Sequence, residues 1–272
     1  MARAHPSGKD EQAAQAAERQ SPSSRIVHQA IVQEGTEELR RPAAALFWSA
    51  VAAGLSMGFS LVAQSELRAR LSDQPWRPLV DSLGYSVGFL VVILGRQQLF
   101  TENTLTPILP LIDRDEPIRI LEVARLWLAV LVGNLVGVVA IAWVLGRSDL
   151  LSPEVRRAAA ELGREALAPG FGVVLLRGIM AGWLIALIVW LLPAAETAHV
   201  WIIIIITWLI GVGHFSHVIA GSVDVSVLAW SGEVGWLRAL GSFTAPALIG
   251  NIIGGVTLVA FLNHAQVKTG RR

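Results

Sequence analysis

Two histidines in an otherwise apolar segment are the residues with the clearest chemical potential. His214 and His217 interrupt an apolar segment that begins at residue 199. The segment contains WIIIIITWLIGVG at 201–213 and continues as HFSHVIAGS. An ionisable side chain within a membrane span is energetically unfavourable and is therefore a functional candidate. Imidazole titrates near neutral pH, so His217 in particular could exchange protons with a solute. The alternative is a neutral histidine whose ring is satisfied by a backbone carbonyl.

The spacing of the two histidines also raises the question of a metal site. Residues three apart on a helix lie near one face, where two imidazoles can share a metal ion. The chain has no H-E-x-x-H pattern and no obvious carboxylate partner for this pair. We therefore expect no metal and no other cofactor.

A second polar interruption, RQQLFTENTLT at residues 96–106, lies between two apolar stretches. A helix break at membrane depth is tolerated only where it faces protein or a wet cavity, because lipid cannot satisfy free backbone groups. These residues are therefore expected to line or plug a path, with Thr101, Asn103 and Thr104 as hydrogen-bonding groups. Glu102 could act as an acid there, although a carboxylate near an interface is more often solvated or paired.

Two arginines and two asparagines complete the set of candidates. Arg177 stands near the start of an apolar span, where it could attract anions at a pore mouth or extend to the membrane interface. Arg96, at the broken end of the other segment, has the same two interpretations. Asn134 and Asn251 lie within apolar spans, and hydrogen bonding across helices is the first expectation for both.

The elements that must position these residues are apolar segments long enough to cross a bilayer. Of 272 residues, 53% are hydrophobic and only 16% are charged, whereas ordinary soluble domains have about 25% charged residues. A lipid-facing surface accounts for this composition. The sequence predicts six spans, of which the second and fifth contain the polar interruptions. The expected spans are 43–63, 79–95, 120–145, 171–192, a broken span beginning at 199, and 242–263.

The spans form one expected membrane domain, residues 43–263, flanked by polar ends. Residues 1–24 have the composition of a disordered tail, and 25–42 could be an amphipathic helix on the membrane surface or further disorder. Residues 1–42 contain no continuous apolar core, so they are not a cleavable signal peptide. A basic tail, 264–272, ends the chain. An even number of spans puts both termini on one side, which a weak excess of Lys and Arg assigns to the cytoplasm.

Composition also excludes several classes of function. The chain has no cysteine, which rules out disulfides, cysteine-ligated zinc, iron–sulfur clusters and thiol catalysis. A formal net charge of +1 argues against nucleic acid as a partner. Neither GxGxxG nor GKS/T strings occur and no Ser–His–acid set stands out, so we do not expect an enzyme.

Two short strings indicate an internal repeat. GNLVGVV at 133–139 lies in the third span, and GNIIGGV at 250–256 lies in the sixth. An interrupted span precedes each of them, so spans 1–3 and 4–6 read as two copies of one plan. Because three is odd, the second copy must be inverted, an arrangement that places broken helices around a solute path. The alternative is that the glycines only permit close helix packing and that the match is coincidental.

Taken in order, these motifs resemble those of the formate/nitrite transporter family across most of residues 40–263. The matching strings are LFT at Leu99–Thr101, GNLVG, RGIMAGWLIALIVW at Arg177–Trp190, HFSHVIAG at His214–Gly221, and GNIIGG. The resemblance implies an aquaporin-like all-α fold in a homopentamer with one pore per protomer. It also places the family's central histidine on His217 and its loop threonine on Thr101.

The chain departs from the family pattern at several positions. Ser216 stands where the family has Glu, Gly221 where it has Asn, and Ala181–Gly182 where it has a Cys–Asn pair. The residues that we expect along the path are His217, Thr101, Phe100, Leu99, Arg177, Asn251, Asn134 and His214.

A channel for small monovalent anions such as formate or nitrite, in the bacterial inner (plasma) membrane, is the function that the resemblance implies. An anion enters an apolar slit only at a high desolvation cost, which a proton shared from His217 would offset. Arg177 would attract the anion, and Thr101 would orient the histidine. Loss of the family Glu and Asn leaves a neutral-solute channel as an alternative. A non-conducting accessory or stress-adaptation protein is another.

Overall fold

The computed structural model describes residues 22–113, 119–195, 197–262 and 265–266, and across them the regular elements are all helical. The helices are α2 (Ser24–Arg40), α3 (Ala43–Arg70), α4 (Arg77–Leu94), η1 (Glu102–Thr104), α5 (Ile108–Ile112), α6 (Ile120–Arg147), α7 (Pro153–Leu167), α8 (Phe171–Leu191), η2 (Leu192–Ala194), α9 (His199–Val212), α10 (Val218–Ser231), α11 (Trp236–Ala239), η3 (Leu240–Thr244), α12 (Ala245–Ile253) and η4 (Gly254–Phe261). The predicted tails 1–24 and 264–272 lie almost wholly outside the described residues.

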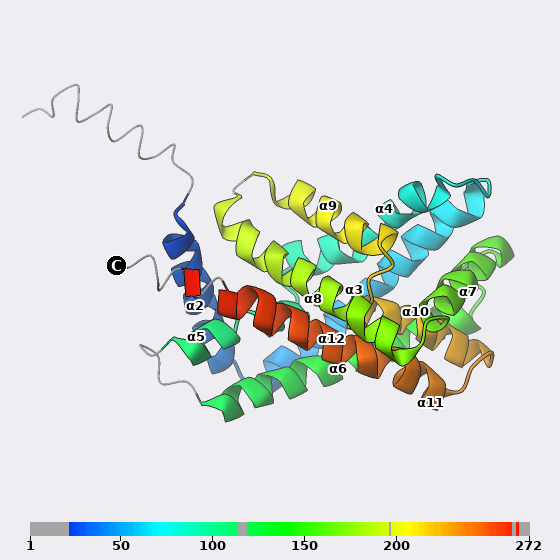
Figure 1. The fold of residues 1–272 in the computed structure, drawn as a ribbon. Coiled ribbons are helices and arrows are strands. Elements are labelled where there is room, and N and C mark those ends of the chain that lie inside the picture. Colours follow the sequence, from blue (N-terminus) through cyan, green and yellow to red (C-terminus); the bar gives the residue numbers. More distant parts are fainter. Residues whose placement is uncertain (1–21, 114–118, 196, 263–264, 267–272) are drawn as a thin grey trace, which may run out of the picture.

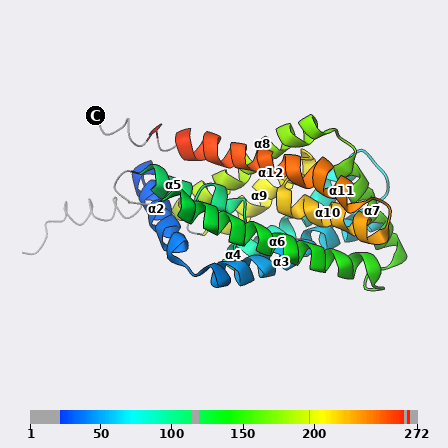
Figure 2. The same ribbon diagram turned by 90° about the horizontal axis from the view of Figure 1, so that it is seen from below.

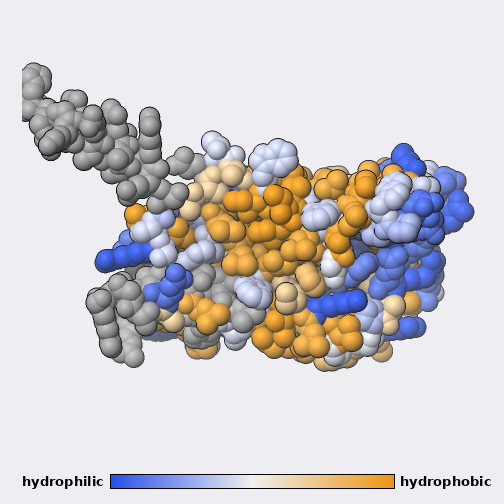
Figure 3. Space-filling view, turned by 45° about the horizontal axis from the view of Figure 1, so that its top comes forward, coloured by the Kyte–Doolittle hydropathy of each residue, from blue (hydrophilic) through white to orange (hydrophobic). Residues whose placement is uncertain are grey.

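The long helices run side by side between two ends of the molecule. Figures 1 and 2 show α2 and α5 at one end and α7 and α11 at the other. Figure 3 shows a broad apolar surface between them, with hydrophilic residues gathered at the α7 end. Within the described residues, five helical stretches are long and apolar enough to cross a membrane, and α9 and α10 are shorter apolar helices. The chain is therefore a multi-pass, all-α membrane protein.

Both predicted breaks are present, and they begin in the same way. The helix α4 ends at Leu94 and α9 ends at Val212, each followed by a glycine and then by a residue with a φ of 50°, Arg96 and His214. A non-glycine residue in this left-handed region is unfavourable by about 1–3 kcal/mol, so its surroundings must hold it there. The shared geometry supports a repeat, with the pair α9 and α10 standing where the broken fifth span was expected.

The glycines of the two repeated strings permit close packing of helix pairs. A Cβ on Gly133 of α6 would lie 2.6 Å from the carbonyl oxygen of Phe47 in α3. A Cβ on Gly250 of α12 would lie 2.3 Å from the carbonyl oxygen of Leu175 in α8. The backbones therefore touch at equivalent points of the two halves, as small residues at membrane helix interfaces allow.

Substitution of Gly250 by alanine is expected to destabilise the protein by about 1–3 kcal/mol, because the added methyl group must push α12 away from α8. Gly172→Ala is the matched control, since no atom lies within 4 Å of a Cβ at that position of α8. We expect the control to change stability by no more than about 1 kcal/mol. Thermal unfolding in detergent, followed by tryptophan fluorescence, measures both. Equal midpoints for the two variants would contradict the packing argument.

Two elements differ from the sequence-based expectation. The helix α3 continues to Arg70 rather than ending near residue 63, and this extension carries Arg68 to its buried acidic partner Asp81. The amphipathic α2 buries Val27, Ile31 and Leu39 and packs against α5, α8 and η2, while Ile26 stays exposed. Its apolar face therefore contacts protein, whereas the sequence favoured a membrane surface or disorder.

Candidate functional site

The two broken spans meet at a hydrogen bond between Thr101 and His217. The Thr101 Oγ1 and His217 Nε2 atoms are 2.7 Å apart, and both residues are almost completely buried. His217 also caps α10, because its Nδ1 accepts the backbone N–H of Ala220 at 3.1 Å. Since Nδ1 uses its lone pair as an acceptor, a neutral ring carries its proton on Nε2. His217 then donates to Thr101, which leaves the threonine hydroxyl hydrogen available to another acceptor.

Asn134 holds the first break in place. Its Oδ1 accepts the backbone N–H of Phe100 at 2.9 Å, and its Nδ2 donates to the carbonyl oxygens of Gln98 at 2.9 Å and Ala50 at 2.8 Å. The bonds to Phe100 and Gln98 satisfy backbone groups on both sides of Leu99 that no helix would satisfy, and the bond to Ala50 ties the break to α3.

Asn251 does the same for the second break. Its Oδ1 accepts the backbone N–H of Val218 at 2.9 Å, and its Nδ2 donates to the carbonyl oxygens of Ser216 and Gly178, each at 2.8 Å. His217 is thus the residue between the two clamped positions, as Leu99 is in the first break. The matching bonds make Leu99 and His217 positional counterparts.

One aromatic ring packs on the histidine and a second lies against Gly221. The ring centroid of Phe89 lies 4.9 Å from that of His217 in an edge-to-face arrangement. A Cβ on Gly221 would lie 2.1 Å from the Phe243 ring, so that ring occupies the space above the glycine. Gly221, at the position where the resemblance implies Asn, has no side chain, and the Phe243 ring fills the space that a side chain would occupy.

A cavity of about 70 Å³ opens from His217 toward α7. Arg177 and His214 line it together with His217, so three of the predicted residues meet in one space. Among the described residues, no charged group pairs with the Arg177 guanidinium. Leu99 and Phe100 are fully buried and are not part of this lining.

Several polar residues that the sequence reading did not select also line the cavity: Gln64, Tyr85, Glu165, Ser216 and Asp224. Asp224 lies within the apolar helix α10, and the rule that intramembrane ionisable residues are functional candidates could have identified it. Tyr85 and Gln64 carry no charge and no motif, so only their position in the fold brings them to the site.

A buried ion-pair cluster forms the wall beside the cavity. Arg68 of α3 donates from Nε to Asp81 of α4 at 2.8 Å and from Nη1 to Glu165 of α7 at 2.7 Å. The Arg68 and Asp81 side chains are 4% and 0% exposed. The cluster therefore joins three helices and fixes α7 over the site.

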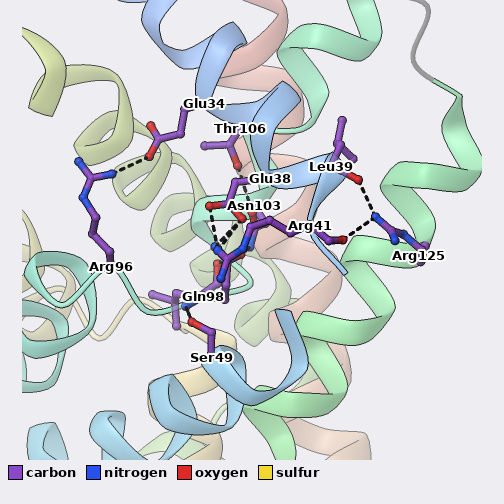
Figure 4. A network of polar contacts seen from close by, with 11 residues as sticks. Glu34, Glu38, Leu39, Arg41, Ser49, Arg96, Gln98, Asn103, Thr106 and Arg125 are labelled. Atoms are coloured by element: carbon purple, nitrogen blue, oxygen red, sulfur yellow. Dashed lines mark hydrogen bonds and ion pairs between the residues drawn. The ribbon is translucent and has the colours of Figure 1, made fainter. Parts of the chain in front are cut away.

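On the opposite side, α2 is tied to the first break (Figure 4). The Arg96 guanidinium lies 3.6 Å from the Glu34 carboxylate, and Gln98 donates to Glu38 at 2.8 Å. Asn103 of the break donates to Gln98 at 3.0 Å. Burial raises the pKa of the Glu34 carboxyl, an effect that the Arg96 charge opposes.

No group of three or more metal-ligating His, Asp or Glu side chains occurs in the described part of the chain. The fit of the site to a metal ion therefore rests on His214 and His217 alone. His217 uses both ring nitrogens in hydrogen bonds to Thr101 and Ala220, and that leaves neither nitrogen available as a ligand.

Comparisons with known proteins agree with this fold. The family model for the formate/nitrite transporter matches residues 25–265. The Escherichia coli K12 inner membrane protein YfdC is 39% identical over 242 residues, which cover 89% of this chain and 78% of that protein. The Bacillus thuringiensis formate channel BtFdhC is 27% identical over 246 residues, covering 88% of this chain and 92% of the relative. A solved pentameric formate channel with formate bound has a TM-score of 0.70 at 22% identity, covering 82% of this chain and 97% of that one.

Proposed function

The chain belongs to the formate/nitrite transporter family, and we propose that it is a channel for small monovalent weak acids, with formate and nitrite as the first candidates. The observation that carries the proposal is the buried Thr101–His217 hydrogen bond where the two breaks meet. A titratable ring at that point of an apolar passage is suited to share a proton with a passing anion.

The surroundings of His217 support this role. The ring sits at the N-terminus of α10, a helix of 14 residues whose first N–H groups carry partial positive charge. An anion that reaches this point meets that positive helix end and the hydroxyl hydrogen of Thr101, which the bond from His217 leaves available. Arg177 lines the approach and would raise the local anion concentration. In this proposal Asn134 and Asn251 do not contact the anion, and they hold in place the two breaks that form the walls of its path.

The setting of the channel follows from its relatives. One relative is named an inner membrane protein and one structural neighbour is a pentamer, and we extend both properties to this chain. The described chain begins with α2 and ends after η4 at the same end of the molecule (Figure 1). That arrangement supports termini on one side, which we take to be the cytoplasm. The partners in this proposal are the lipid bilayer, other copies of the chain and the anion.

Thr101→Val is expected to reduce formate flux about tenfold in proteoliposomes, because loss of the hydroxyl leaves the buried His217 N–H unpaired, worth about 1–3 kcal/mol. Flux is measured at pH 5 and pH 7.5 beside wild type and His217→Ala. Thr257→Val, which removes an exposed hydroxyl bonded to Ile253 within the helix, is the matched control and should retain wild-type flux.

The outcomes separate the candidate functions. Flux of formate or nitrite that depends on pH and changes in His217→Ala supports the histidine-dependent anion path. Permeation of uncharged solutes without formate or nitrite would replace it with a neutral-solute channel. Absence of any flux from correctly folded wild type would leave an accessory role.

A further inference from the structure

An apolar groove runs along the outer surface of α6. It has a volume of about 810 Å³ and follows one stripe of the helix from Val132 to Val144. Leu55 of α3 and Trp230 of α10, the two helices that pack against α6, complete its walls. Figure 2 shows α6 extending from the α2 end of the molecule toward the α7 end. Every side chain that lines the groove is aliphatic or an indole, so the groove suits a hydrocarbon chain.

The length of the groove matches one leaflet of a bilayer. Val132 and Val144 are separated by 12 positions, which correspond to about 18 Å of helix at about 1.5 Å per residue. One leaflet contributes about 15 Å to the hydrocarbon core. Because α6 ends at Arg147, the groove occupies the half of the helix nearer α7. A lipid acyl chain has this reach, whereas a membrane-spanning helix of another protein would cover both leaflets.

Indole rings stand at the α7 end of the groove. The N–H of Trp230 donates to the carbonyl oxygen of Val139 at 3.0 Å, and its ring packs edge to face on Trp236. Trp143 is 53% exposed, and its N–H has no acceptor in the described part of the chain. Tryptophan collects at the level of lipid headgroups, where its ring is half wet. Trp230 is therefore held as a wall, while Trp143 keeps a donor for an ester carbonyl of a lipid.

Arg147 extends the stripe of groove residues by one helical turn. It follows Trp143 by four residues and Val144 by three, spacings that place side chains on one face of a helix. The next acid along the chain, Asp149, already pairs with Arg156 at 3.2 Å. Arg147 is exposed and has no ion pair or hydrogen bond within the residues that the structure describes. An unpaired guanidinium at this depth is suited to bind the phosphate of an anionic lipid.

We propose that the groove is a binding site for one anionic phospholipid per chain. An acyl chain lies along Val132, Val136 and Ala140, and the phosphate lies against Arg147. A second copy of the chain fits less well, because it would have to bring an acidic group to Arg147 and a segment that covers one leaflet only. The groove shares no lining residue with the cavity beside His217, so the proposal does not depend on the transport function.

Native mass spectrometry of the intact protein in detergent tests the headgroup contact. The protein is titrated with phosphatidylglycerol or with phosphatidylethanolamine of the same acyl chains. We expect wild type to bind its first phosphatidylglycerol per chain about fivefold more tightly, the contribution of one arginine near a lipid surface. Arg147→Gln should reduce this preference to less than about twofold. Arg157→Gln is the matched control, since Arg157 is an exposed arginine of α7 that pairs with Glu154 at 3.4 Å.

Ala140→Phe tests the groove without a change of charge. Ala140 is exposed and lines the groove, so a phenyl ring at this position takes up space that an acyl chain would fill. Binding of phosphatidylglycerol should weaken about tenfold, which corresponds to the lost burial of about two methylene groups. Ala124→Phe is the matched control, because Ala124 is exposed near the other end of α6 and lies outside the groove.

The outcomes separate the possible occupants. Loss of the lipid preference in Arg147→Gln and of binding in Ala140→Phe, with both controls unchanged, supports the inference. Equal binding of the two lipids by wild type, or a full preference in Arg147→Gln, overturns it. Competition by glycerophosphoglycerol at the same concentration as the intact lipid would identify a phosphate site without an acyl groove and also overturns it.

The oligomer mass from the same spectra distinguishes a second copy from a lipid. If Ala140→Phe dissociates the oligomer while Ala124→Phe leaves it intact, a second copy occupies the groove and the inference is wrong. Formate flux is measured separately in proteoliposomes. Absence of flux from wild type would overturn the proposed function and leave the lipid site standing.

Discussion

Replacement of Arg68 by methionine is expected to lower the free energy of unfolding by about 3–5 kcal/mol. The substitution leaves Asp81 with a charge in a site where its side chain is 0% exposed. The second carboxylate oxygen, Asp81 Oδ1, is also buried and has no hydrogen-bond partner, so Arg68 is its principal compensation. The substitution would in addition remove the bond of 2.7 Å that joins α3 to Glu165 of α7.

The neighbouring Arg70→Met provides the control for this prediction. Arg70 pairs with Glu66 on the exposed surface of the same helix, where an ion pair contributes about 0–1 kcal/mol. Thermal unfolding in detergent gives the two midpoints. A double variant, Arg68→Met with Asp81→Leu, should recover most of the loss, because it removes both buried charges. Similar midpoints for Arg68→Met and Arg70→Met would show that the cluster does not hold these helices together.

Asn251→Leu is expected to cost at least about 3 kcal/mol and to abolish flux. The substitution removes three hydrogen bonds at once and leaves the N–H of Val218 and the carbonyl of Ser216 buried without partners, whereas the carbonyl of Gly178 keeps its bond within α8. Each such group is unfavourable by about 1–3 kcal/mol. Two of the three hydrogen bonds are to the residues on either side of His217. Their loss would therefore displace the His217 ring as well as destabilise the fold.

Gln33→Leu is the matched control, since this exposed amide of α2 bonds only to Glu37 at 3.0 Å. Stability is measured by thermal unfolding and flux by formate uptake in proteoliposomes. Asn134→Leu should repeat the stability loss, because Asn134 makes the equivalent three bonds in the first break. Wild-type flux in a stable Asn251→Leu protein would mean that the clamp does not position the histidine.

The sequence alone was enough to predict the class of fold and the location of the breaks. Long apolar runs require lipid, and polar residues within them require a break that faces protein. The paired strings GNLVG and GNIIGG also predicted equivalent asparagines, and Asn134 and Asn251 do make matching bonds. These inferences hold because they depend on local composition and on short strings whose physical demands are the same wherever they fold.

The path residues expected from the sequence coincide only in part with the residues that line the cavity. Arg177, His214 and His217 do line one cavity, but Leu99 and Phe100 lie outside its lining. The roles of all these residues in transport stay predictions. Within a helix that is apolar on every side, hydrophobic periodicity carries no information about which side chain faces lipid, protein or a cavity.

Only the tertiary structure determined which distant residues meet. Arg68, Asp81 and Glu165 come from three helices and form one cluster, and their separation in the sequence contains no signal of that contact. Asp224 is a single acid in an apolar helix, and its position in the cavity depends on how α7, α4 and α3 pack around α10. The all-helical, membrane-spanning class follows from the transfer of side chains between water and lipid, whereas the site follows from helix packing, which local sequence does not specify.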